Sequence, residues 1–143
     1  GGSGYMFRAA TVQDFSAVTG ACLLVKTSVW DEVHGLDEAF AVAFNDVDFC
    51  LRVRDAGYRI AWTPYAQLTH YESKSRGGDE KDPVKAARFA AEQQRLYTVH
   101  GKENILDDPY YNPNLTRDRE DFSESDDLRG LKEGRITVRY RGA

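Results

Sequence analysis

The sequence has no hydrophobic run near the roughly 20 residues that a membrane-spanning helix needs, and no signal-peptide pattern near its start. It has only two cysteines, Cys22 and Cys50, which allow at most one disulfide. Each lies in an apolar segment, where a buried free thiol is the commoner state. Basic residues are not in excess, and the net charge of -4 argues against a surface that binds nucleic-acid phosphates. We therefore expect a cytoplasmic protein, free or at the inner face of the membrane, with no nucleic-acid partner.

What is present suits a globular domain: 143 residues, 41% of them hydrophobic. Ser16–Lys26 is nearly continuous in small and aliphatic residues, which predicts a central strand covered on both faces. The next segment predicts a short helix, Ser28–His34, with Thr27 as its N-cap and Gly35 just past its end.

A second helix is predicted over Phe44–Ala56, with Asn45 as the N-cap candidate and Gly57 at its end. Its apolar positions fall at helical spacing opposite its charged ones. The expected inward residues are Phe44, Val47, Cys50 and Leu51, and the expected outward residues are Asp48, Arg52 and Asp55. Two short extended segments, Tyr58–Trp62 and Ala66–His70, follow on either side of a proline.

The clearest helix pattern covers Asp82–His100, which opens with an acid and a proline and ends before a glycine. Asp107–Asp127 is rich in acids, prolines and asparagines without periodicity, and should wrap the surface or be mobile. Arg135–Arg141 alternates as a terminal edge strand does, or as a strand that leads into a further part of the protein. We accordingly divide the chain into a folded part, residues 1–101, and an acidic tail, residues 102–143.

Three motifs occur in order: TGACLLVK from Thr19, FNDVDFCLRVRDAGYRI from Phe44, and TPYAQLTHYESKSRG from Thr63. Together with DPYYNPNL from Asp108, this set resembles the second, acceptor-side half of family 2 glycosyltransferases. The resemblance implies a partial GT-A fold, an α/β sandwich with a mixed sheet, that lacks the nucleotide-binding half. That half, from the same polypeptide, would be a partner, and a fragment without it should form a homo-oligomer.

The resemblance places the catalytic residue at Asp46, the first Asp of the acidic helix start. There it would be the general base that deprotonates the acceptor hydroxyl. The family more often has Glu where this chain has Asn45. Asp46 also fits a purely structural role, as an acid that complements the helix dipole.

Asp48 is a candidate substrate-binding residue, but its spacing favours a structural role. It lies three residues after Asn45, as the second half of a capping box does, and four before Arg52, an ion-pair spacing. Asp46-Val47-Asp48 matches the metal-binding DxD pattern. However, side chains at i and i+2 of a helix point about 200° apart and chelate one ion poorly. We therefore expect the metal-binding DxD in the other half.

The resemblance assigns His70 to a divalent metal, Mn²⁺ or Mg²⁺, whose remaining ligands would lie in the other half. The loop that follows, with Lys74, Ser75 and Arg76, suits the diphosphate oxygens of the donor, or is simply solvated. Trp30 is the candidate stacking platform for the acceptor sugar, although such aromatic residues more often belong to a core.

Two other histidines, His34 and His100, are expected at helix C-termini, as surface or packing residues without a functional role.

The function implied is inverting transfer of a sugar from a nucleotide-diphospho-sugar donor to a glycan or lipid-linked acceptor. The setting would be bacterial polysaccharide or cell-envelope synthesis, and this chain alone should be inactive. Two alternatives remain: a non-catalytic binding or assembly module, and a small metal hydrolase built on Asp46, Asp48 and His70.

Overall fold

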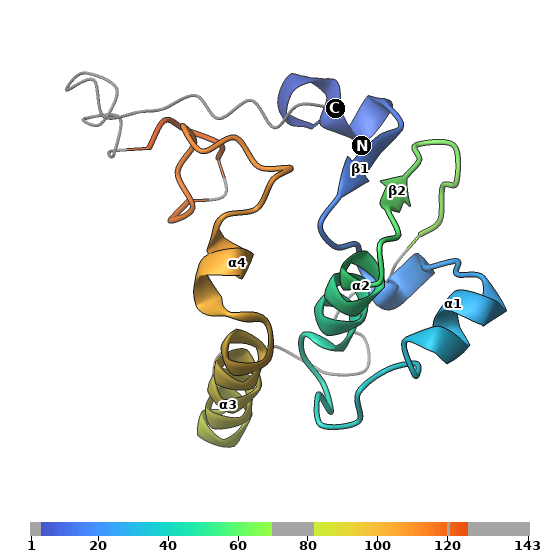
Figure 1. Cartoon of the computed structure of the whole chain (residues 1–143). Helices are drawn as coiled ribbons and strands as arrows, with labels where there is room; N and C mark the ends of the chain where they lie inside the picture. The colour runs from blue at the N-terminus through green and yellow to red at the C-terminus, as the bar shows by residue number, and fades with distance from the viewer. Residues whose placement is uncertain (1–3, 70–81, 120, 126–143) are drawn as a thin grey trace. The chain divides into compact units, whose positions relative to one another are not determined.

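The computed structural model describes residues 4–69, 82–119 and 121–125, and divides the chain into two compact units, Gly1–Tyr110 and Tyr111–Ala143. The first unit holds all the named helices and strands (Figure 1). In chain order they are η1 Tyr5–Ala10, β1 Gln13–Phe15, η2 Gly20–Cys22, α1 Thr27–Glu32, α2 Asn45–Asp55, β2 Ile60–Trp62, α3 Pro83–His100 and α4 Lys102–Leu106. Among the described residues, no helix has the length and apolar character needed to cross a membrane.

The sheet of the described residues has two antiparallel strands, β1 and β2, which lie side by side in Figure 1. Gln13 pairs with Trp62 and Phe15 with Ile60, and the Phe15 and Trp62 rings meet edge to face with centroids 6.3 Å apart. Helices with a small sheet confirm the predicted α/β class.

The predicted strand Ser16–Lys26 is wrong. This segment holds the short 3-10 helix η2, and the extended residues after it pair with no strand among the described residues. Leu23 and Val25 still pack against the core, while Leu24 between them is 98% exposed. The apolar run therefore reflects the alternating burial of its side chains. It does not form a β-strand, because a strand also needs an adjacent strand with which its backbone forms hydrogen bonds.

The buried core cluster gathers residues of α1, α2 and β2 and the residue just after α1. Its members are Val29, Val33, Phe49, Cys50, Val53 and Ile60. The helix predicted over Ser28–His34 is confirmed as α1. Its N-cap, however, is Lys26 and not Thr27, and the helix start has no side-chain capping hydrogen bond. Both cysteines are free, and the expectation of two buried thiols fails for Cys22, which is exposed.

Helix α2 confirms the second predicted helix, but its inward face differs from the predicted one. Phe49, Cys50 and Val53 are buried, and so is Asp48, which the pattern had placed outside. Of the expected inward set, Cys50 is buried and the others are half-buried. The pattern failed because it treated a charge as necessarily exposed, whereas Asp48 has charged and polar partners inside.

Helix α3 begins as predicted, since the Asp82 carboxylate accepts from the backbone N–H of Val84 at 3.0 Å and a proline follows at the first helical position. It ends before Gly101, whose φ is +78°. The short helix α4 after it was not predicted. Strand β2 is confirmed, but the described part of the second extended segment, Ala66–Thr69, is not a strand.

The segment after α4 returns to the start of the chain. Ser16 Oγ donates to Asp108 Oδ1 at 2.5 Å, and Arg8 donates to the Tyr110 carbonyl at 3.0 Å. In the second unit, an isolated antiparallel bridge joins Leu115 to Glu124. The predicted edge strand Arg135–Arg141 lies outside the described residues.

Candidate functional site

Helix α2 starts at an unusual backbone position. Its N-cap, Phe44, is left-handed with φ +63°, and the helix start has no side-chain capping hydrogen bond. The expected capping roles of Asn45 and Asp48 are therefore wrong. Asn45 instead accepts from the neighbouring backbone N–H of Asp46 at 2.8 Å. The polar side chains of this first turn are thus available for other contacts.

Asp46 is half-buried, and a backbone amide holds each of its oxygens. Oδ2 accepts from the N–H of Gly20 at 2.8 Å, and Oδ1 accepts from the N–H of Val47 at 2.9 Å. A carboxylate oxygen has more than one acceptor position. The group is therefore fixed in orientation at the mouth of the helix and retains capacity to accept a proton from a hydroxyl.

The partner amide comes from the turn η2 in the TGAC motif. The Thr19 hydroxyl accepts from the N–H of Ala21 at 3.3 Å and so caps this turn. Gly20 packs closely on the acid, because an added Cβ would lie 3.3 Å from the Asp46 Cβ. The two motifs, 26 residues apart, thus meet in one geometry, and Gly20 is a site residue that the sequence did not single out.

Asp48 lies inside the protein, with 1% of its side chain exposed, and both oxygens are bonded. Oδ2 accepts from Nε and Nη2 of Arg52 at 2.9 and 2.7 Å, which confirms the predicted ion pair. Oδ1 lies 2.8 Å from Nε2 of His100. Arg52 also donates to the carbonyls of Val33 and Gly35. This arrangement supports a structural role for Asp48, because no oxygen of it faces an open surface.

His100 was expected to have no role beyond the helix end, yet its side chain is only 7% exposed and bonds to Asp48. No local pattern marks it, since the partners are 52 residues apart.

Trp30, the proposed acceptor platform, is 38% exposed. Its ring lies 5.2 Å from that of Phe49 and directly over Gly35, where an added Cβ would come within 2.8 Å of the indole. Much of the indole surface is therefore used in packing.

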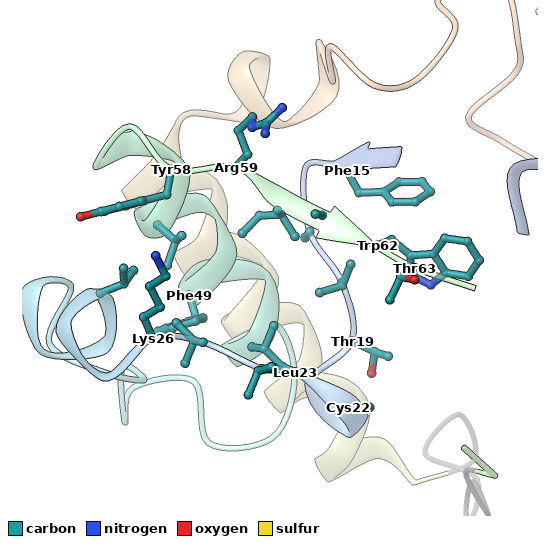
Figure 2. Close-up of a pocket in the computed structure, with 18 of the residues that line it drawn as sticks. Phe15, Thr19, Cys22, Leu23, Lys26, Phe49, Tyr58, Arg59, Trp62 and Thr63 are labelled. Carbon is teal, nitrogen blue, oxygen red and sulfur yellow. The ribbon is translucent and has the colours of Figure 1, made fainter. Parts of the chain in front are cut away.

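A groove of about 790 Å³ runs beside the core (Figure 2). Figure 2 shows that its walls come from the extended segment after β1, from α2 and from β2, with Leu23, Phe49 and Trp62 among the lining residues. The lining is mainly apolar, and Lys26 and Arg59 are its charged members. The groove offers an apolar surface for a packed segment or ligand.

Two groups near this groove have shifted acidities. The Tyr58 hydroxyl donates to Glu32 at 2.8 Å, which raises the pKa of Tyr58 because the charged carboxylate disfavours a phenolate. Burial raises the pKa of the Cys50 thiol. Both groups therefore stay neutral at physiological pH.

His70, Lys74, Ser75 and Arg76 lie outside the described residues. Within residues 4–69, 82–119 and 121–125, no three His, Cys, Asp or Glu side chains gather as metal ligands. The metal and diphosphate assignments remain predictions.

The chain is similar to parts of several longer bacterial proteins. It is 48% identical to the uncharacterized protein y4gI of Sinorhizobium fredii over 124 residues, which is 84% of this chain and 13% of that protein. It is 33% identical to the O-antigen biosynthesis protein RfbC of Myxococcus xanthus over 104 residues, 73% of this chain and 8% of that protein. It is 34% identical to an N-acetylglucosaminyl-diphospho-decaprenol L-rhamnosyltransferase of Mycobacterium tuberculosis over 80 residues, 56% and 24% of the two chains.

The chain thus spans between 8% and 24% of the length of these curated relatives. No family model matches it, and no solved structure matches it significantly. The named relatives nevertheless show that the chain is related in sequence to a rhamnosyltransferase and to a protein of O-antigen biosynthesis.

Proposed function

We propose that this chain is the acceptor-side portion of a family 2 glycosyltransferase with a GT-A fold, and that Asp46 is its general base. The observation that carries the proposal is the Asp46 carboxylate, held at the mouth of α2 by the N–H groups of Gly20 and Val47. Its support is chemical, since a general base must be fixed within hydrogen-bond reach of the hydroxyl that it deprotonates.

In the proposed reaction, the acceptor hydroxyl gives its proton to Asp46 while its oxygen forms a bond to the anomeric carbon of the donor. The bond from that carbon to the diphosphate breaks, and the nucleoside diphosphate leaves with the electron pair. Attack on the face opposite the leaving group inverts the anomeric configuration. Asn45, beside the base, accepts from the backbone N–H of Asp46, while the hydrogen bonds of the Asp46 carboxylate come from Gly20 and Val47.

The leaving group is proposed to meet Lys74, Ser75 and Arg76, whose side chains suit diphosphate oxygens. His70 would be one ligand of a Mn²⁺ or Mg²⁺ ion, which neutralises diphosphate charge when bound. The other ligands and the nucleotide pocket are proposed to come from a segment of the same polypeptide outside this chain. Trp30 is proposed to contact the acceptor with the exposed part of its ring.

The apolar groove supports the proposal that a separate segment of the polypeptide supplies the nucleotide pocket. The extended residues Leu23–Val25 line the groove, pair with no described strand, and leave Leu24 almost fully exposed. We propose that the nucleotide-binding half covers this surface, and that the chain by itself transfers no sugar.

The test is turnover of Asp46→Asn in the longer polypeptide that we propose contains this chain. Because one relative is named for L-rhamnose transfer, a nucleotide-diphospho-L-rhamnose is the first donor to assay. Loss of a general base should lower turnover about a hundredfold or more while donor affinity stays near wild type. Asp55→Asn, an exposed acid of the same helix, is the matched control and should keep full turnover.

Near-wild-type turnover in Asp46→Asn would remove Asp46 from the mechanism. A separate outcome, in which the unsubstituted protein transfers no sugar from any donor, would favour the non-catalytic binding module instead.

A further inference from the structure

Helix α3 contacts the segment that carries the candidate base at two points near its middle. The buried Glu92 accepts from the backbone N–H of Ala43 at 2.6 Å, just before α2. The Phe89 ring lies 4.9 Å from that of Phe44, the left-handed cap of α2. Helix α3 therefore fixes the backbone that leads into α2.

The third contact is the His100 ring at the end of α3, which lies against the first turn of α2 itself. Asp48 is buried and Arg52 already occupies its Oδ2, so Oδ1 depends on Nε2 of His100 at 2.8 Å. A carboxylate paired with an arginine only accepts, so the ring must carry its proton on Nε2 and donate it. A buried oxygen that loses its donor is left unsatisfied at a cost in free energy, which favours a rearrangement that gives it a new partner.

Any such movement reaches the candidate base. Asp48 lies two residues after Asp46, and its backbone N–H bonds to the Phe44 carbonyl at 2.8 Å, so it belongs to the same first turn. Asp46 in turn has a tight fit against Gly20, with a 2.8 Å hydrogen bond that a small shift of the turn would lengthen.

We propose that His100 is a positioning residue, which holds Asp48 and through it the first turn of α2, so that Asp46 points at the acceptor hydroxyl. This inference rests on the proposed function of Asp46. His100 touches no reacting atom, and its effect is on the orientation of the base.

The first measurement uses this chain and needs no activity. The Gly20 amide bonds to the Asp46 side chain, so its hydrogen exchange reports the position of the base. His100→Phe keeps a ring but removes the donor, and should speed exchange at Gly20 by about tenfold, the effect of losing one hydrogen bond. His100→Gln supplies an amide donor and should bring exchange back to within about threefold of wild type.

Asn104→Ala is the matched control, because Asn104 bonds to the carbonyl of His100 at 3.0 Å without touching Asp48. It should leave exchange at Gly20 unchanged. A His100→Phe protein whose Gly20 amide exchanges like the wild type would overturn the proposal. So would a folded His100→Gln protein that exchanges as fast as His100→Phe. Where His100→Phe fails to fold, a folded His100→Gln protein whose Gly20 amide exchanges about tenfold faster than in the wild type would still overturn the proposal.

The second measurement is turnover in the longer protein. His100→Phe should lower kcat about tenfold or more with KM little changed, and His100→Gln should restore most of it. Full activity in Asp46→Asn refutes the proposed function whatever His100 does. An inactive Asp46→Asn together with a fully active His100→Phe refutes only the positioning role.

Discussion

The Asp48→Asn substitution tests the buried network directly. It changes the side-chain volume little but removes the charge that faces Arg52. The asparagine carbonyl oxygen can still accept from the guanidinium, and its NH₂ can face His100, whose ring would then have to accept. The two bonds from Arg52, at 2.7 and 2.9 Å to one oxygen, would then end on a neutral amide and no longer on a carboxylate, which weakens them.

The expected loss of stability follows from the burial of the two partners. Removing one member of a buried ion pair costs about 3–5 kcal/mol, because the other charge is left without compensation. Here the Arg52 side chain is 25% exposed and keeps its bonds to the carbonyls of Val33 and Gly35. That residual compensation lowers the expected loss to about 2–3 kcal/mol in the free energy of unfolding. Such a loss is a large share of the stability of an ordinary domain.

The assay is urea unfolding followed by tryptophan fluorescence, since Trp30 lies against Phe49, next to Asp48. Asp55→Asn, in the last turn of the same helix and exposed, should change the free energy of unfolding by less than about 0.5 kcal/mol. A double-mutant cycle with Arg52→Gln should give a coupling energy of about 1 kcal/mol or more. Equal midpoints for Asp48→Asn and Asp55→Asn, or no coupling to Arg52, would show that the network adds nothing to stability.

Two further predictions concern backbone and assembly. Gly35→Ala should lower the free energy of unfolding by about 2 kcal/mol, since the φ of Gly35 is +66° and the new Cβ would lie 2.8 Å from the Trp30 ring. Gly57 has a φ of +89° but open space around it, so Gly57→Ala should lower the free energy of unfolding by only about 1 kcal/mol. Equal losses in the free energy of unfolding for the two variants would mean that the Trp30 ring moves aside freely. Because Leu23–Val25 pairs with no strand among the described residues and lines an apolar groove, the chain should form dimers, as measured by light scattering at micromolar concentration. A monodisperse monomer, with and without the residues after Asp127, would contradict the proposed need for a covering half.

The sequence predicted local features well because they depend on neighbours in the chain. Helix α3 is the clearest case, since its cap Asp82, the proline after it and the closing Gly101 all act within a few residues of where they stand. The order of motifs likewise points to Asp46 as the candidate base, through the family resemblance, and that role stays a prediction.

The strand predicted at Ser16–Lys26 shows the opposite case. Its composition correctly signals partial burial, as the packing of Leu23 and Val25 on the core shows. A strand, however, is defined by a partner, and no described strand pairs with this segment. Hydrophobicity along a chain reports the environment of each residue and not the identity of its hydrogen-bond partners.

The charged residues of the candidate site also depend on partners that lie far away in the sequence. Asp48 was placed on the outer face of its helix because an unpaired charge is rarely buried. Its burial becomes possible only when Arg52, four residues away, and His100, 52 residues away, both reach it. The first partner is visible in the sequence and the second is not. Asp46 likewise fits its motif in the sequence, but Gly20, which fixes its orientation, is 26 residues distant. A motif can therefore name a candidate base, whereas the groups that aim it come from other parts of the fold.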